Sequence, residues 1–196
     1  MKVPNISFSN KVVIEFVSIS FAVLLALMVN QCKDNYNTSK LAKVSLSNIR
    51  SEINNNKEIM QEMVLAHKNS LLKVDSLLPL LTENSKVGED VNRIISFKLI
   101  SSNSWETAKL TQSIQYMDIN IVQEISAVYK LQDYYELIVK DIVLNNMYKK
   151  VEQSDLKTSE KTKQFLKAVI PIEENLLITY NYLLTDLLVE KKETSK

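Results

Sequence analysis

The longest apolar stretch of the chain runs from Val12 to Val29 and is interrupted by only one glutamate and two serines. A membrane-spanning helix needs about 17 to 25 predominantly apolar residues, and no other segment of this chain meets that requirement. The pattern therefore predicts three parts: a short tail at residues 1–11, a transmembrane helix at 12–31, and a polar domain at 32–196.

A cleaved secretory signal is the main alternative, because Lys2 and Lys11 precede the apolar run. The run is longer than the ~7 to 15 residues of a signal-peptide core, and Met28–Cys32 contains no pair of small residues for cleavage. Bulky Gln31 also stands where a small residue would precede a lipidated cysteine at Cys32. We therefore expect an uncleaved anchor.

Charge on the two flanks of the anchor is nearly balanced, so the positive-inside rule alone does not fix the orientation. Moving a short lysine-bearing tail outward is unfavourable, whereas large domains translocate largely regardless of their charge. We expect a single-pass protein of a bacterial inner membrane, with the polar domain on the exported side.

Beyond the anchor, apolar residues recur at intervals of three, four or seven, which is the spacing of one helix face. The first such series is Ile49, Ile53, Met60, Val64, His67, Leu71, Val74, Leu78 and Leu81. It predicts a helix that continues from the membrane, almost without a break, to the region between Pro79 and Ser85.

Three further helical stretches follow. One begins near Val87 and includes Leu99, and one spans Asp118 to about Lys150 with Asp118 as its N-cap. The last carries an apolar face after a loop-like start at 152–163, and Pro171 should kink or restart it.

Between the second and third stretches lies a serine-rich interval that ends in Asn103. Asn103 with Glu106 has the spacing of a capping box, which predicts a fresh helix start just before Trp105.

Composition supports the same fold class. The 196 residues contain one glycine and three prolines, whereas tight turns, hairpins and phosphate-binding loops depend on glycine. The prediction is an all-α protein, in which an N-terminal transmembrane helix continues into an antiparallel helical bundle of about four long helices.

Charge and residue inventory argue against catalysis. The formal net charge is +1, from 24 basic and 23 acidic residues, so no nucleic acid partner is indicated. His67 and Cys32 are the only histidine and cysteine and lie far apart in the sequence. No nucleophile–histidine pair or cluster of transition-metal ligands can be built from them. We expect no enzyme activity, no cofactor and no metal.

The anchor carries one distinctive set of positions, which are spaced three, four, four and four residues apart and so share one helix face. The set is Glu15, Ser18, Ala22, Ala26 and Asn30. Small residues allow close approach of another helix, and an intramembrane carboxylate favours a protein partner over lipid. This predicts an intramembrane helix contact, with another membrane protein or with a second copy. The alternative is that Glu15 extends to the headgroups and the face arises by chance.

Two polar residues, Asn56 and His67, lie on the apolar face of the first bundle helix. Buried polar groups of this kind fix helix register when neighbouring groups satisfy them. The alternative for His67 is a titrating switch, because histidine changes charge near neutral pH.

Two blocks of the chain resemble a group of uncharacterised bacterial proteins with one N-terminal transmembrane helix. The first block is Ile14-Glu15-Phe16-Val17, leading to Asn30-Gln31 and followed by Ile49-Arg50 and His67; the second is Ser104–Lys109 with Ile125–Tyr129. In those relatives a glycine is expected in the anchor and a tryptophan after Asn-Gln, where this chain has Cys32. The resemblance implies the architecture and no catalytic activity.

Together these features predict a membrane-anchored accessory or scaffold protein whose partners are the lipid bilayer and other proteins. A ligand-sensing bundle that signals through a partner protein is the second interpretation, and a polar cavity between the helices would distinguish it. An enzyme would require carboxylates that converge in one pocket.

Overall fold

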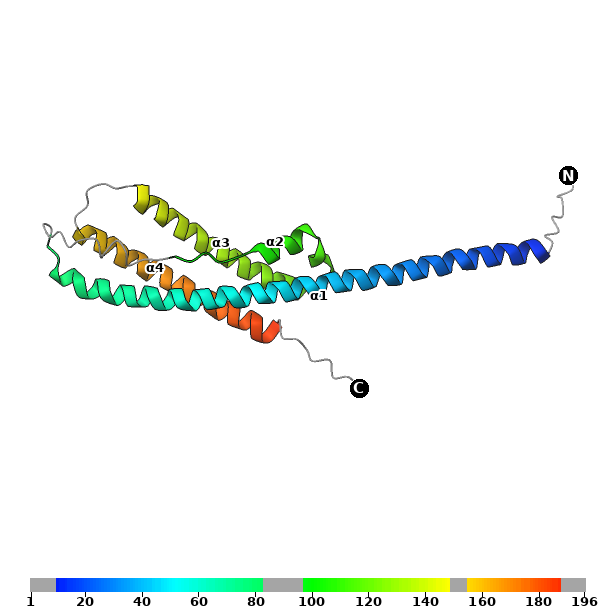
Figure 1. Ribbon diagram of the computed structural model, residues 1–196, viewed down its shortest axis with the longest axis horizontal. Coiled ribbons are helices and arrows are strands. Elements are labelled where there is room, and N and C mark those ends of the chain that lie inside the picture. The colour runs from blue at the N-terminus through cyan, green and yellow to red at the C-terminus, as the bar shows by residue number, and fades with distance from the viewer. Residues whose placement is uncertain (1–9, 83–96, 149–154, 188–196) are drawn as a thin grey trace, which may run out of the picture.

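The computed structural model describes residues 10–82, 97–148 and 155–187. Its dominant element is α1 (Asn10–Leu77), a single helix of 68 residues that is about 100 Å long at 1.5 Å per residue. No glycine or proline interrupts α1, and these are the residues that most strongly disfavour a helix interior. Figure 1 shows its N-terminal half extending beyond all other helices.

The chain returns toward the N-terminal part of α1 through a short and irregular segment, which we call the leg. After α1, the 3₁₀ turn η1 (Leu78–Leu80) contains Pro79. Residues 97–102 are extended and lead into α2 (Asn103–Leu110) and the 3₁₀ turn η3 (Ser113–Tyr116). Gln112 ends α2 in the left-handed conformation, with φ of 57°.

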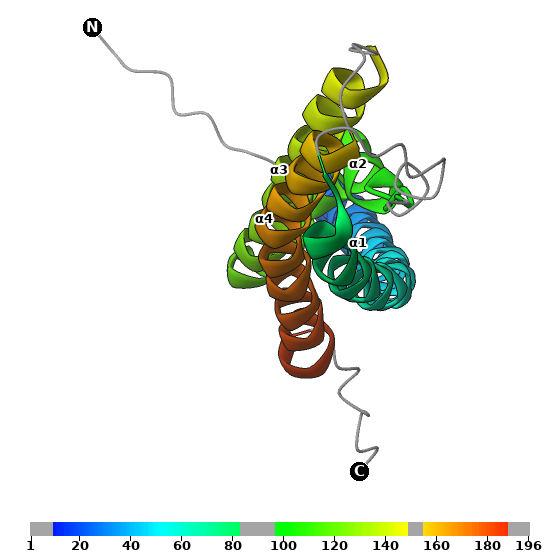
Figure 2. The same ribbon diagram turned by 90° about the vertical axis from the view of Figure 1, so that its left-hand side faces the viewer.

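Two long helices complete the bundle. They are α3 (Ile119–Tyr148) and α4 (Asp155–Tyr182), and α4 is followed by the π-helical turn η4 (Leu183–Leu187). α4 runs antiparallel to α1 and packs along its C-terminal half, and it also contacts α3 (Figures 1 and 2). Long tyrosine side chains from α3 reach across to α1.

The core follows the heptad-like face of α1. Within it, Ile49, Ile53 and Met60 are completely buried. They pack with residues of α3 and α4, among them Ile125, Tyr135, Leu166, Val169, Leu176 and Tyr180. The all-α fold with a helical bundle is therefore confirmed, with four α-helices in the described ranges.

Several local predictions are also confirmed. α1 is unbroken up to the turn at Pro79, and a helix begins at Asn103, just before Trp105. Asp118 caps α3, because its Oδ1 accepts a hydrogen bond from the Asn120 backbone N–H at 2.8 Å.

Others are wrong in detail. Leu99 lies in the extended leg with 90% of its surface exposed, not on a helix face; Val87 and its neighbours lie outside the described residues. The capping box does not form, because Asn103 is already helical and Glu106 pairs with Lys109 at 2.6 Å. The last helix begins at Asp155, within the range expected to be loop-like, and it is continuous through Pro171, so the predicted restart does not occur; the alternative of a kink at Pro171 stays a prediction.

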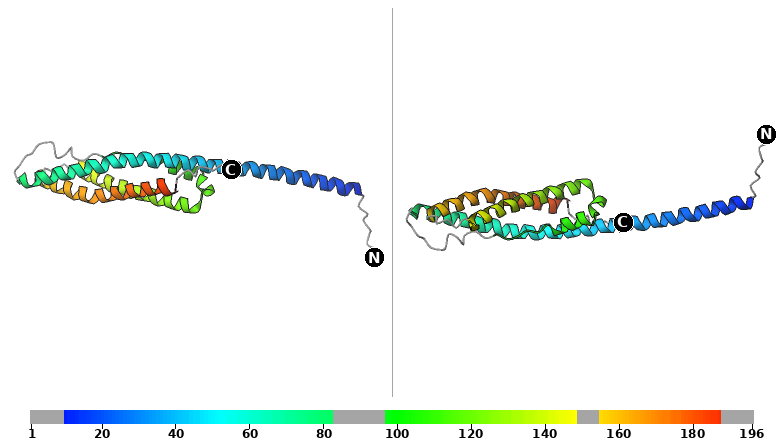
Figure 3. Two further views of the ribbon diagram at one scale, coloured as in Figure 1. Left: turned by 90° about the horizontal axis from the view of Figure 1, so that it is seen from below. Right: turned by 90° about the horizontal axis from the view of Figure 1, so that it is seen from above.

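The first part of α1 has a different environment from the rest. Residues 13–41 are exposed apart from two half-buried positions, and the first buried residue is Ala42. A stretch near the N-terminus is long and apolar enough to span a membrane, and none of it is buried within the protein. Figure 3 shows this part of α1 extending away from the bundle in both views.

Candidate functional site

The predicted intramembrane contact lies on the exposed part of α1. Because α1 is continuous there, its five positions, Glu15, Ser18, Ala22, Ala26 and Asn30, share one side of the helix, and all five are exposed. No other described segment covers them, so the intramembrane contact stays a prediction.

Two polar members of this face have partners within the helix. The Ser18 hydroxyl donates to the Ile14 carbonyl at 2.8 Å, and the Asn30 side-chain amide donates to Asp34 Oδ2 at 3.2 Å. Local bonds of this kind reduce the cost of polar groups in an apolar environment. Of the three polar side chains on this face, Glu15 is the ionisable one within the apolar run.

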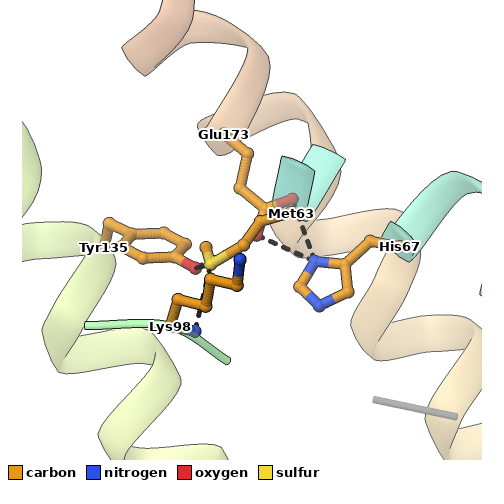
Figure 4. Close-up of polar contacts among 5 residues, drawn as sticks. All are labelled: Met63, His67, Lys98, Tyr135 and Glu173. Carbon is orange, nitrogen blue, oxygen red and sulfur yellow. Dashed lines mark hydrogen bonds and ion pairs between the residues drawn. The ribbon is translucent and has the colours of Figure 1, made fainter. Parts of the chain in front are cut away.

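A second polar group is buried at the centre of the bundle. His67 on α1 and Glu173 on α4 are both 0% exposed, and His67 Nδ1 lies 2.9 Å from Glu173 Oε1 and 3.0 Å from Oε2. The Tyr135 hydroxyl, from α3, donates to Glu173 Oε1 at 3.1 Å. Figure 4 shows side chains from three helices meeting here, so the group connects α1, α3 and α4.

The surroundings of this group are tightly packed. Met63 Sδ accepts the Lys98 backbone N–H at 3.2 Å and lies 3.9 Å from the Tyr135 hydroxyl (Figure 4). The Phe97 ring lies edge-on to the His67 ring, with centroids 5.3 Å apart. Burial raises the pKa of the Tyr135 hydroxyl far above its usual value, and the negative charge of Glu173 and the hydrogen bond to it raise it further.

The His67 group has the residue types of a proton-transfer site without access for a substrate. His67, Glu173 and Tyr135 are each at most 2% exposed, and Cys32 lies 35 residues from His67 on the same helix, which is about 50 Å. Among the described residues no group of three or more His, Cys, Asp or Glu side chains could hold a metal ion. The geometry favours a structural role for the group, since its polar atoms are engaged with one another.

Asn56 attaches the extended leg to α1. Its side-chain amide donates to the Ser101 carbonyl at 2.7 Å, and its Oδ1 accepts the Ser101 backbone N–H at 2.9 Å. The Asn56 side chain thus pairs with both the N–H and the C=O of Ser101, as the backbone of a neighbouring strand would do in a sheet. The structure therefore places both Asn56 and His67 in the core with long-range partners; their role in helix register stays a prediction.

Glu52 reinforces the same attachment one helical turn away. It accepts hydrogen bonds from the Ser101 hydroxyl at 2.7 Å, the Ser104 backbone N–H at 2.9 Å and the Tyr129 hydroxyl at 2.6 Å. Tyr129 in turn stacks on Trp105, with ring centroids 5.6 Å apart. One carboxylate thereby ties the start of α2 and the middle of α3 to α1.

Neither Glu173 nor Glu52 was identified as a buried partner from the sequence, although the position of Glu173 in its helix indicates such a role. Glu173 lies four residues after Val169 and three before Leu176, so it occupies the apolar face of its helix and could have been recognised as a buried partner for His67. Glu52 gives no such signal, because its partners, Ser101, Ser104 and Tyr129, lie 49 to 77 residues later in the chain.

Two hollows open on the surface along α1. The larger, of about 440 Å³, is lined by Ser47, Arg50, Ser51, Asn54, Lys57 and Leu184. The smaller, of about 330 Å³, is lined by Asn48, Ser51, Glu52, Asn55, Ser101 and Ser104. Both are polar and open to solvent.

Comparisons of the chain with protein-family models, curated protein sequences and solved structures find no match. Inference about function therefore depends on the geometry described above.

Proposed function

We propose that this protein is a membrane-anchored accessory or scaffold protein, which acts through protein–protein contacts of its anchor and its bundle and not through catalysis. The observation that carries the proposal is the continuity of α1, which is both the candidate membrane span and the central helix of the bundle. A helix shared in this way transmits the position and rotation of the anchor directly to the bundle.

The exposed part of α1 supports anchoring. The apolar side chains between Val13 and Val29 are about half or more exposed, and so many exposed apolar groups on one segment indicate contact with lipid or protein. The first buried residue, Ala42, lies about 20 Å beyond Val29 along the helix axis. The bundle is thus held clear of the headgroup region.

We place the anchor in a bacterial inner membrane with the bundle on the exported side, in line with the resemblance of the sequence and because large domains translocate largely regardless of their charge. Cys32 offers a direct test, because it is the only cysteine and is exposed. A membrane-impermeant maleimide added to intact spheroplasts should label it; labelling only after lysis would place the bundle in the cytoplasm.

The buried centre supports scaffolding over ligand sensing. A sensor of this fold would hold its ligand in a polar cavity between the helices, whereas the polar centre at His67 is filled by protein side chains. The two open hollows lie on the surface along α1 instead.

The intramembrane contact can be tested by adding bulk to its face. Ala22→Leu with Ala26→Leu should reduce the protein recovered with the full-length chain from mild detergent by about tenfold, because large side chains prevent close helix approach. Ser20→Leu is the matched control, since Ser20 lies about 200° around the helix from Ala22. Equal recovery for all variants would contradict the proposal.

A further inference from the structure

The membrane-proximal part of α1 carries a row of unpaired cations. They are Lys33, Lys40, Lys43, Arg50 and Lys57, and none of them lies within ion-pair distance of a carboxylate in the described part of the chain. Ion pairs do form on more distal positions of α1, where Lys68 pairs with Glu174 and Asp75 with Lys163, both at 2.6 Å. Basic charge is therefore concentrated on the part of α1 nearest the anchor.

These cations lie on one side of α1, which we call the basic face. Lys33 and Lys40 are seven residues apart, as are Lys43, Arg50 and Lys57, and seven residues are about two helical turns. All are exposed or half-buried; Lys43, Arg50 and Lys57 each follow one of the core positions Ala42, Ile49 and Asn56 and so lie about 100° around the helix from it. The larger hollow, lined by Arg50 and Lys57, forms the distal end of the basic face.

Two carboxylates, Asp34 and Glu52, lie between Lys33 and Lys57, and a third, Glu58, follows Lys57 directly. Asp34 accepts a hydrogen bond from Asn30, and Glu58 accepts one from Asn54 at 3.1 Å. Glu52 points to the leg and to α3, where it accepts three hydrogen bonds. Hydrogen bonds from neutral amides leave the carboxylate charges in place, so the segment from Lys33 to Lys57, with five cations and two carboxylates, carries a net positive charge.

From this face we infer that an acidic helix of a membrane-anchored partner protein binds along α1 between Lys33 and Lys57. This deepens the proposed function, on which it rests, by naming the chemistry of the partner. The inference combines charge complementarity with spacing, because helices packed nearly parallel repeat their contacts every seven residues. Asp or Glu residues at that interval on the partner would face both rows of cations.

Anionic lipid does not account for the whole face. Lys57 lies about 40 Å beyond Val29 along the helix, whereas a headgroup layer is several Å thick and the electrostatic screening length is about 8 Å at physiological salt. Headgroups can reach Lys33 but not Arg50 or Lys57.

A second copy of the chain does not fit either. A parallel homodimer through the basic face would place like charges opposite one another, which is destabilising. The partner is therefore a different protein.

The basic face is also aligned with the predicted intramembrane contact. Lys33 follows Glu15 by 18 residues and Lys40 follows Ala22 by the same number, which is about five full turns of helix. A partner whose own membrane helix packs on the anchor therefore meets Lys33 and Lys40 directly, and it reaches Lys43, Arg50 and Lys57 by winding around α1, because positions seven residues apart drift by about 20° per heptad.

Photo-crosslinking in native membranes tests this, with benzoylphenylalanine placed at Tyr36 on the basic face or at Ala22 in the anchor. We expect the Tyr36 probe to crosslink to a protein at a peptide that is acidic and adjoins a transmembrane segment. Lys40→Glu with Lys43→Glu should lower that crosslink about tenfold, because each contact changes from attraction to repulsion. Raising salt to about 1 M should also lower it, since screening then acts within about 3 Å.

The matched control is Lys130→Glu with Lys140→Glu, which makes the same charge change at exposed positions of α3 and should leave the Tyr36 crosslink unchanged. A Tyr36 crosslink to lipid, to a second copy of this chain or to a non-acidic peptide overturns the inference. If the Ala22 probe crosslinks to protein and the Tyr36 probe does not, the inference fails while the proposed function stands. If neither probe crosslinks to protein, both fail.

Discussion

The residues that are most costly to bury in this fold are a histidine and a glutamate, both of which are completely inaccessible to solvent. Isolated buried charges are costly, and an acidic and a basic group buried together stabilise a fold only when their remaining polar atoms are engaged. Here Glu173 has both His67 and Tyr135 as partners. The fold should therefore be stable while all three side chains are present, and it should be destabilised when any one of them is removed.

Replacing Glu173 alone should be strongly destabilising. Glu173→Ala removes the carboxylate that His67 and Tyr135 share, and breaking a buried pair in this way costs about 3 to 5 kcal/mol. Thermal unfolding of the full chain in mild detergent would measure the loss.

The double variant His67→Phe with Glu173→Leu should recover part of that loss, because apolar residues of similar volume need no polar partner. If the double variant is no more stable than Glu173→Ala, the pair contributes packing and not mutual electrostatic satisfaction.

The buried Tyr180 hydroxyl should make the free energy of unfolding fall as pH rises in the alkaline range. Its buried hydroxyl has no hydrogen-bond partner in the described structure, and burial raises its pKa far above 10.0, with further contributions from Glu136 and Glu52. The folded state keeps Tyr180 protonated where the unfolded chain loses that proton. The resulting stability is complete below pH 10 and declines as pH rises above it.

Tyr180→Phe should therefore stabilise the protein by about 1 kcal/mol at pH 7, because an unpartnered buried hydroxyl is removed. The difference from wild type should widen by about 1.0 kcal/mol between pH 10 and pH 11, because the unfolded tyrosine is already half-ionised at pH 10. Denaturant unfolding at pH 7, 10 and 11 would measure both effects. A constant difference would mean that the Tyr180 hydroxyl ionises in the folded protein.

At the level of whole elements, the sequence predicts best where periodicity is long. α1, α3 and much of α4 follow directly from repeating apolar positions and from the scarcity of glycine. Pro171 did not restart α4, because packing of Leu166, Val169 and Ile170 against the core outweighs one lost backbone hydrogen bond. Tertiary contacts of this kind are not visible in a local pattern.

The leg at 97–102 shows why the rest could not be predicted. Its apolar and serine residues suit a helix by composition, yet its conformation is fixed by Asn56 and Glu52, which lie some 45 to 52 residues earlier in the chain. The end of α2 could not be predicted from the sequence either. Helices often end at a glycine in the left-handed conformation, whereas here Gln112 adopts that conformation.

Asn56 should accordingly stabilise the leg more than it stabilises α1, the helix to which it belongs. Asn56→Ala removes two hydrogen bonds to Ser101 and should cost about 1 to 3 kcal/mol, because the Ser101 N–H loses its partner, whereas the Ser101 carbonyl keeps the Gln132 side-chain amide at 3.3 Å. Hydrogen exchange should then accelerate at Ser101 while α1 remains protected. Asn55→Ala, at an exposed neighbouring position, is the control and should leave exchange at Ser101 unchanged.

For the molecule as a whole, the central question is whether anchor and bundle move as one body. Residues 30–41 have no packing partner in the described structure, and short isolated helices are marginal in water. In α1, however, this stretch is continued by helix on both sides, so it needs no nucleation of its own. We therefore expect it to remain helical and to fix the rotation between the anchor face and the basic face.

A distance measurement between spin labels tests that expectation in the full chain. The exposed native Cys32 and Leu72→Cys are 40 residues apart on α1, which predicts a narrow distribution near about 60 Å. Leu41→Cys with Leu72→Cys, in a chain whose Cys32 is replaced by serine, is the control and should give about 46 Å. A short or broad first distance beside a narrow control would locate a hinge between Cys32 and Leu41. Such a hinge would separate the two faces, and a partner bound in the membrane would then no longer be directed along Lys40 and Arg50.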